Sequence, residues 1–206
     1  MDPRDRLPKL FLLSPASATG RRALQLASPR ASFAAADRLR SPEGLPIGEA
    51  FCFMSALYFR GKMAYARRFA AAAASILIIA PGFGLVPPEW PLDLARLRKL
   101  ARTPVDPAHR GYSAPLRRQA RELALRLPAA AGIVLLGSIA TGKYLDLLVP
   151  ILGERLLFPR AFAGTGDMRR GALMLRAAAS GEELEYAGCE QRRGGGATPR
   201  RAVNEP

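Results

Sequence analysis

Short runs of apolar residues punctuate the chain, and turn-forming residues close most of them. Such runs occupy residues 10–13, 75–80 and 133–136, and a fourth occupies 155–158. Runs of this length that end in serine, proline or glycine are typical of strands buried on both faces. We therefore expect at least four strands, most of them inside a sheet.

Amphipathic segments separate these runs. Residues 23–40 have a helical composition that Pro29 interrupts, and a helical pattern begins near Phe59. A further helix is expected to start at a Ser113 cap, with its apolar stripe formed by Leu116, Ala120, Leu123 and Leu127. The segment PGFGLVPPEWP, by contrast, predicts a rigid loop.

The order of these elements predicts the fold class. Strands that alternate with helices favour an α/β fold: a three-layer arrangement with a mostly parallel sheet flanked by helices. We expect residues 1–189 to form a single α/β domain. Residues 190–206 are rich in glycine and arginine, contain no core residues, and are expected to form a disordered tail.

One uncharged segment has the length of a membrane span. Residues 69–88 read FAAAAASILIIAPGFGLVPP and carry no charge. The first half continues a helix, and the second half is a short isoleucine-rich run broken by proline and glycine. A helix followed by a buried strand explains this composition better than a spanning helix, so we expect no membrane insertion.

The amino-acid composition indicates which class of molecule the protein binds. Lysine and arginine number 31 against 17 aspartates and glutamates, which gives 206 residues a formal charge of +14. This excess favours nucleic acid or a nucleotide as partner, although arginines on solvated helix faces would give the same composition. Cys52 and Cys189 are far apart and suit neither a zinc site nor a disulfide framework. With no signal-peptide pattern at the start, we expect a cytoplasmic protein without a cofactor or a metal.

The stretch 137–144 resembles a phosphate-binding loop. GSIATGKY fits the pattern G-x-x-x-x-G-K, but Tyr144 stands where a serine or threonine should hold magnesium. A tyrosine ring carries its hydroxyl too far out for that role. The pattern therefore favours a tight strand-to-helix turn whose free N–H groups can face an anion, with a triphosphate hydrolase that uses Lys143 as the alternative.

Polar and small residues follow several predicted strands. Because the carboxyl ends of parallel strands meet at one sheet edge, these residues should gather there and form a ligand site. Taken singly, each is an ordinary turn residue. The candidate ligand-binding residues of these loops are Ser14, Ser17, Thr19, Phe83, Gly84, Ser138 and Thr141.

The loop at 164–171 combines three glycines, a carboxylate and two arginines. Gly164 and Gly166 permit close approach of the backbone to a ligand, and Arg169 could contact it. Asp167 is the candidate general base, although it could instead pair with an arginine of the same loop. Glu49 and Glu89 are the other carboxylates that could carry acid–base chemistry.

Three further polar residues suit a structural interpretation better. Tyr58, Arg60 and Lys62 form a cluster that is typical of a solvated helix face. The single histidine, His109, lies in a proline-bordered loop and is expected at the surface.

Four segments in a fixed order resemble a known family. LFLLSPASATG, LYFRGKMAYARRFA, APGFGLVPPEWPLD and LLGSIATGKY follow one another between Leu10 and Gly171. This order resembles the YaaA-like branch of the uracil-DNA-glycosylase-like superfamily. The resemblance implies nucleobase or nucleic-acid binding near these loops. True uracil-DNA glycosylases carry an Asp- or Asn-type water-activating loop after the first strand, where this chain has Ser14-Pro15-Ala16.

These observations predict a protein that binds a nucleotide, a nucleobase or nucleic acid at the carboxyl edge of its sheet. Glycosidase-like hydrolysis is the reaction that such a site could add. The alternatives are a phosphate-loop hydrolase and a non-enzymatic basic module that binds nucleic acid through its arginine helices and tail. The sequence predicts no oligomeric state.

Overall fold

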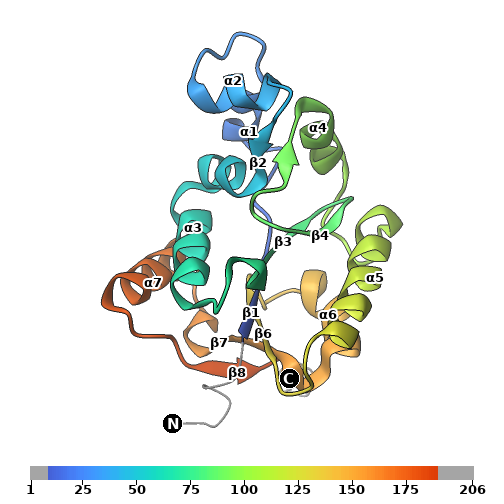
Figure 1. Ribbon diagram of the computed structural model, residues 1–206, viewed down its shortest axis with the longest axis vertical. Coiled ribbons are helices and arrows are strands. Elements are labelled where there is room, and N and C mark those ends of the chain that lie inside the picture. The colour runs from blue at the N-terminus through green and yellow to red at the C-terminus, as the bar shows by residue number, and fades with distance from the viewer. Residues whose placement is uncertain (1–8, 190–206) are drawn as a thin grey trace, which may run out of the picture.

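A six-stranded sheet forms the centre of the computed structural model, which describes residues 9–189 (Figure 1). The strand order is β4-β3-β1-β6-β7-β8. The four inner strands run parallel, and the two edge strands are antiparallel to their neighbours. The strands are β1 (Lys9–Leu13), β3 (Ile76–Ala80), β4 (Gly84–Val86), β6 (Gly132–Leu136), β7 (Leu156–Pro159) and β8 (Tyr186–Gly188).

Helices cover both faces of this sheet. Figure 1 shows α3 and α7 on one side of the strands and α5 and α6 on the other. These helices are α3 (Ile47–Phe69), α5 (Arg110–Arg126), α6 (Gly142–Leu152) and α7 (Asp167–Ser180). The expected three-layer α/β fold with a mostly parallel sheet is confirmed.

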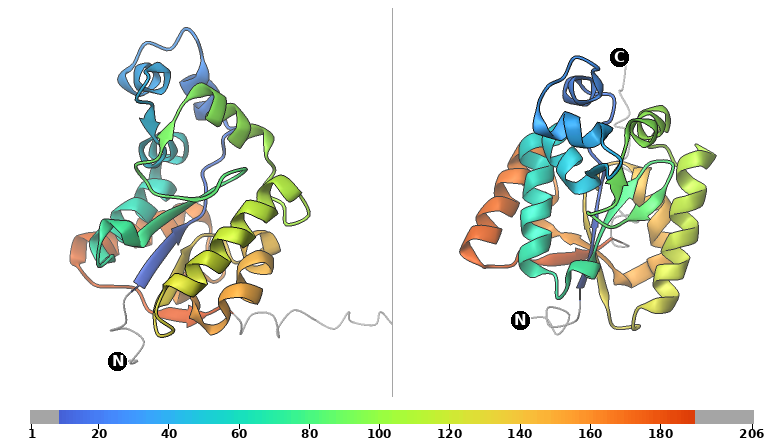
Figure 2. Two further views of the ribbon diagram at one scale, coloured as in Figure 1. Left: turned by 45° about the vertical axis from the view of Figure 1, so that its right-hand side comes forward. Right: turned by 45° about the horizontal axis from the view of Figure 1, so that its top comes forward.

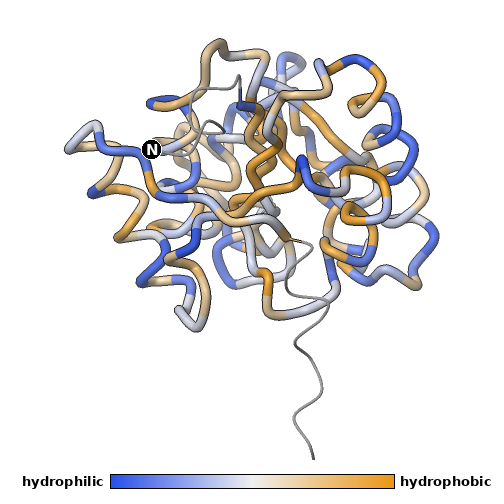
Figure 3. Tube along the Cα trace, turned by 90° about the horizontal axis from the view of Figure 1, so that it is seen from below, coloured by the Kyte–Doolittle hydropathy of each residue, from blue (hydrophilic) through white to orange (hydrophobic). Residues whose placement is uncertain are grey.

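The inner strands supply both cores because their side chains alternate between the two faces. In β1, Phe11 and Leu13 belong to the core under α3 and α7, whereas Leu10 and Leu12 belong to the core under α5 and α6. All five residues of β1 are buried. Figure 3 shows apolar residues concentrated in the central strands, which is the reason these short runs were recognisable in the sequence.

A smaller group of elements stands beyond the carboxyl ends of the parallel strands (Figure 2). A two-stranded antiparallel sheet connects it to the start of α3, where the N–H of Ile47 donates to the Trp90 carbonyl. The group consists of α1 (Arg21–Ala27), α2 (Ala34–Arg40), α4 (Leu94–Arg102), β2 (Leu45–Pro46) and β5 (Pro91–Leu92). This upper group forms one wall above the edge of the sheet.

The structure departs from several predicted boundaries. α3 consists of two helical segments joined at Ala56: the first begins at Ile47, before the predicted helix, and the second follows Ala56, close to the predicted start near Phe59. α5 begins at Arg110, three residues before the predicted Ser113 cap. The predicted rigid loop after β3 contains the edge strand β4. Within residues 9–189, no helix combines the length and apolarity that crossing a membrane requires. The predicted tail at 190–206 lies outside the described residues.

The helices α3 and α7 cross at two glycines. A methyl group on Gly61 would lie 2.7 Å from the carbonyl oxygen of Gly171, and one on Gly171 would lie 3.0 Å from the Tyr58 Cα. Real Cβ atoms essentially never lie closer than 3.0 Å to such atoms, and a distance of 3.0 Å is itself unusually short. The two backbones are therefore in direct contact, and this contact places the start of α7 beside the middle of α3.

We predict that Gly61→Ala lowers the free energy of unfolding by about 1–3 kcal/mol, because the new methyl group forces the two helices apart. Helix propensity alone would give the opposite sign, a gain of about 1 kcal/mol. Urea denaturation measures the difference. Gly111→Ala in α5 is the control, because its methyl group would meet only the exposed His109 side chain. A neutral or stabilising Gly61→Ala would contradict the close crossing.

Candidate functional site

A cavity of about 610 Å³ lies at the carboxyl edge of the parallel strands. The chain leaves β1 toward the face covered by α3, and it leaves β6 toward α6 on the opposite face (Figure 1). Adjacent strands whose connections diverge in this way open a crevice where α/β proteins bind ligands. The cavity therefore occupies the position in this fold that is most favourable for a site.

The ends of β1 and β6 are drawn together beneath the cavity. The N–H of Ser14 donates to the Leu136 carbonyl at 3.1 Å, which extends the parallel ladder by one residue. A methyl group on Gly137 would lie 2.9 Å from the Cβ of Ser14. Glycine at this position thus allows the hydroxyl-bearing loop after β1 to lie against the loop after β6.

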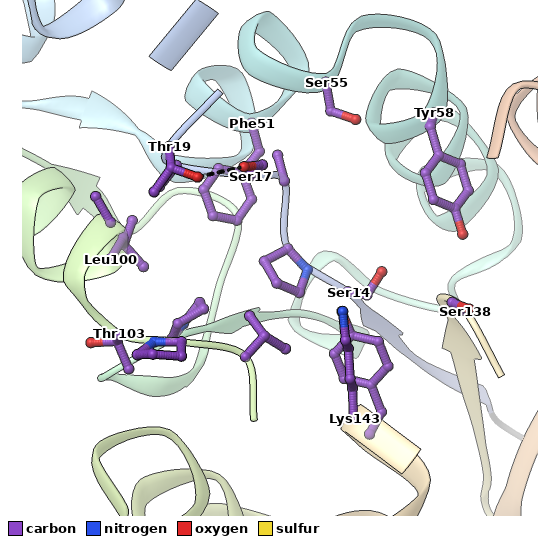
Figure 4. A pocket seen from close by; sticks show the side chains of 18 of the residues that line it. Ser14, Ser17, Thr19, Phe51, Ser55, Tyr58, Leu100, Thr103, Ser138 and Lys143 are labelled. Atoms are coloured by element: carbon purple, nitrogen blue, oxygen red, sulfur yellow. Dashed lines mark hydrogen bonds between the residues drawn. The ribbon is translucent and has the colours of Figure 1, made fainter. Parts of the chain in front are cut away.

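The cavity wall contains hydroxyls, two tyrosines, one exposed lysine and one carboxylate, together with apolar side chains. Figure 4 shows the loop after β1 on one side and the start of α6 below it. The polar and aromatic lining residues are Ser14, Ser17, Thr19, Phe51, Ser55, Tyr58, Thr103, Ser138, Thr141, Lys143, Tyr144 and Asp167. Among residues 9–189, Asp167 is the one carboxylate that lines the cavity.

A buried lysine supports the floor of the cavity. The amino nitrogen of Lys62 donates to the Ser14 carbonyl at 3.0 Å and lies 2.7 Å from the Ser14 hydroxyl oxygen. It also lies 3.9 Å from the centre of the Tyr58 ring. The Lys62 side chain is only 1% exposed. It therefore connects α3 to the end of β1 through a single amino group.

Burial controls the charge of this lysine. The pKa of Lys62 is lowered to about 7, mainly by loss of solvent; the Asp167 carboxylate opposes this fall, and the Arg170 guanidinium contributes to it. Within residues 9–189, Lys62 forms no ion pair with a carboxylate. Near neutral pH, Lys62 is therefore uncharged in a substantial fraction of the molecules.

Polar atoms from α3 and α7 meet beside Lys62. Arg170 is buried and pairs with Asp167 at 3.3 Å, while the Asp167 carboxylate remains 65% exposed. The Tyr58 hydroxyl and the Arg170 Nε are both buried without a hydrogen-bond partner among the described residues. Burial also raises the pKa of Tyr58 and of Tyr144 to about 12, so both phenols keep their protons at neutral pH.

A backbone kink orients α3 at the cavity. Ala56 has φ +42° and ψ −113°, and within residues 9–189 it is the one non-glycine residue with positive φ. Such a conformation costs on the order of 1–3 kcal/mol, and strained residues of this kind are concentrated at functional sites. The kink falls between Ser55 and Tyr58, and both of these residues line the cavity.

The structure brings together six of the residues selected from the sequence. They come from the loops after β1 and β6 and from the start of α7, and they are Ser14, Ser17, Thr19, Ser138, Thr141 and Asp167. The hydroxyls of Ser17 and Thr19 lie 3.2 Å apart and are exposed. The six residues share one cavity because the strands that precede them are parallel and end at the same edge of the sheet.

Five selected residues do not line the cavity. Phe83 and Gly84 lie elsewhere because β3 turns back into β4, which places the Phe83 ring 4.8 Å from the Trp90 ring, between ring centres. Gly164, Gly166 and Arg169 are exposed and lie outside the cavity wall, and the buried arginine of that loop is its neighbour in sequence, Arg170. Glu49, Glu89 and His109 are also exposed and do not line the cavity.

The interpretation of Tyr58 and Lys62 as part of a solvated helix face is wrong. Both side chains are buried, whereas Arg60 between them is exposed. Gly61 could have indicated this burial, because a glycine inside a helix often marks the close approach of another element. The sequence could not show that α7 would provide that element and seal Lys62 from water.

Comparisons with protein-family models, with curated proteins and with solved structures found no match for this chain.

We predict that the buried Lys62 makes stability rise with pH between about 7 and 9. Its folded pKa of about 7 is lower than that of a lysine in the unfolded chain, about 10.4. The unfolded state therefore binds more protons in this window, so the free energy of unfolding increases as pH rises. The raised tyrosine pKa values lie above this window.

Melting temperatures of the wild type and of Lys62→Met at pH 7, 8 and 9 test this effect. The wild type should gain stability relative to the variant as pH rises. Arg60→Met, an exposed neighbour on the same helix, should follow the wild type. Parallel pH profiles of the wild type and Lys62→Met would show that Lys62 does not titrate near neutrality.

Proposed function

We propose that the cavity binds a nucleotide, with its base between the apolar walls and its phosphate at the start of α6. The observation that carries this proposal is the position of the cavity: it lies where β1 and β6 diverge, and it is bordered by Lys143 and by the first turn of α6. A volume of about 610 Å³ lies within the usual range for a small-molecule site.

Aromatic and apolar side chains support the base subsite. Phe51, Tyr58 and Tyr144 contribute rings to the wall, and apolar surface comes from Leu100 in α4 and from Val105 in the loop after α4. A planar base is a ligand that such surfaces can enclose, because ring faces and apolar groups exclude water around it. The serine and threonine hydroxyls of the wall can both donate and accept, as base edges and a ribose require.

The first turn of α6 supports the phosphate subsite. Thr141 precedes the helix, and its side chain makes no capping hydrogen bond. The N–H groups of a first helical turn are suited to an anion. Lys143 is exposed at the cavity wall and adds a positive charge. Tyr112 donates its hydroxyl hydrogen to the Lys143 carbonyl at 3.0 Å, which holds this turn against α5.

Asp167 supports a hydrolytic reaction on such a ligand. Its carboxylate faces the cavity from the start of α7, and it is the acidic lining group identified above. Cleavage of a glycosidic bond develops positive charge on the sugar, which a nearby carboxylate stabilises. The resemblance of four segments to the uracil-DNA-glycosylase-like superfamily supports a nucleobase as the group that this cavity receives.

We predict that Lys143→Ala weakens binding of nucleoside monophosphates about tenfold or more, because a charged hydrogen bond contributes on the order of 1.5–3 kcal/mol. Binding of the matching nucleosides, which lack phosphate, should change little. Isothermal titration calorimetry with the four ribonucleoside monophosphates, the four nucleosides and a short single-stranded DNA measures the affinities. Arg118→Ala, on the exposed face of α5, is the charge-matched control.

Two results would contradict the nucleotide proposal. One is the absence of binding by every nucleotide, nucleoside and single-stranded probe at low salt. The other is magnesium-dependent hydrolysis of ATP or GTP that Lys143→Ala abolishes, which would support the phosphate-loop alternative instead.

We predict that Asp167→Asn abolishes release of the base from a bound nucleotide while affinity for that nucleotide falls less than about threefold. The amide keeps the size of the side chain but removes its charge. Because Asp167 is the partner of the buried Arg170, the variant should also lose about 1 kcal/mol of stability. Chromatographic detection of free base, with thermal melting of the same sample, separates the two effects. Base release at the wild-type rate would exclude Asp167 from the reaction.

A further inference from the structure

The pair of Ser14 and Lys62 has the geometry of a nucleophile and its base. The amino nitrogen lies 2.7 Å from the Ser14 hydroxyl oxygen, which is within the distance over which a base takes a proton. Ser14 lines the cavity, whereas Lys62 lies behind it and does not line the wall. The serine therefore stands between the base and the space where a ligand would lie.

Pairing with a carboxylate does not account for the burial of this lysine. A buried ammonium is costly unless a carboxylate pairs with it, and Lys62 has no such ion pair among residues 9–189. Within residues 9–189 its two hydrogen bonds are both made to Ser14, one to the carbonyl and one to the hydroxyl. Both of these hydrogen bonds therefore join a desolvated amine to one serine.

We infer that Ser14 is a catalytic nucleophile, that Lys62 is its general base, and that the cavity hydrolyses a carboxylic ester. Serine with lysine as its base is a known variant of nucleophilic catalysis. This inference concerns the floor of the cavity, and it goes beyond the proposed binding of nucleotides without depending on it.

The reaction balances with water as the only co-reactant. Ser14 Oγ forms a bond to the acyl carbon while its proton moves to the neutral Lys62 amine. The tetrahedral intermediate collapses, the bond to the alcohol oxygen breaks, and the departing alcohol takes the proton from Lys62. Water then adds to the acyl-serine and transfers a proton to Lys62, and that proton returns to Ser14 Oγ as the carboxylic acid leaves.

The surrounding groups suit this reaction. The Tyr58 hydroxyl is a buried donor without a partner among the described residues, and Figure 4 shows it on the same side of the cavity as the Ser14 hydroxyl. A donor of this kind can stabilise the oxyanion of the intermediate, and the Lys143 ammonium adds positive charge at the cavity wall.

Charges from several elements set the protonation of Lys62. The groups that face it are Ser14 after β1, Tyr58 on α3, and Asp167 and Arg170 at the start of α7. Burial lowers the pKa of Lys62 to about 7. The amine is therefore available as a base near neutral pH, and the reactivity of Ser14 should increase as pH rises through this value.

Covalent labelling with diisopropyl fluorophosphate tests the inference on the full-length protein without nucleotide. Intact mass and peptide mapping should locate one adduct at Ser14 of the wild type. The labelling rate should increase at least tenfold between pH 5.5 and 8 and then level off. Hydrolysis of p-nitrophenyl acetate should follow the same pH profile, and Ser14→Ala should abolish both signals.

Matched variants separate catalysis from packing. Lys62→Met should lower the labelling rate at least a hundredfold while the protein remains folded by circular dichroism, and Ser32→Ala, an exposed serine outside the cavity, should match the wild type. If Lys62→Met does not fold, the pH profile of the wild type still decides the question. The inference is overturned if wild-type Ser14 forms no adduct at pH 8, if labelling is independent of pH, or if folded Lys62→Met reacts at the wild-type rate.

Discussion

The contact between the Lys62 amine and Ser14 ties together the parts of the molecule on which the cavity depends. One partner lies on α3 in the helical layer, and the other lies at the point where β1 leaves the sheet. Because the amine makes both of its polar contacts to one residue, it fixes the backbone and the side chain of that residue at once. The loop after β1 therefore starts from a defined position, and its hydroxyls can face a shared space instead of scattering along the surface.

Two close backbone approaches make this contact possible. Gly61 and Gly171 allow α3 and α7 to touch, which covers Lys62 and excludes water from it. Gly137 allows the ends of β1 and β6 to approach, which brings Ser14 and Ser138 to one cavity. In each case the close approach requires a residue without a side chain. The strained backbone at Ala56 accompanies these approaches, since it bends α3 where that helix meets both α7 and the cavity.

The two proposals assign different parts of the same cavity. The nucleotide proposal uses the aromatic wall and the first turn of α6, where Lys143 supplies charge in contact with solvent. The nucleophile proposal uses the floor, where an amine shielded from solvent adjoins a serine. Desolvation distinguishes the two lysines: Lys143 is exposed at the cavity wall, where an anion can meet it, whereas burial lowers the pKa of Lys62 to about 7, which suits proton transfer.

The amino-acid sequence by itself determined the fold class, because runs of apolar residues such as those of β1, β3 and β6 are local signals of buried parallel strands. Once the strands are parallel, the grouping of Ser14 and Ser138 at one edge follows from topology, and the sequence predicted that grouping. Only the tertiary structure decided the rest. The hairpin between β3 and β4 removed Phe83 from the edge, and the crossing of α3 and α7 buried Tyr58 and Lys62. Burial, and with it the charge of a lysine, depends on which distant segments cover a residue, and no local pattern of residues contains that information.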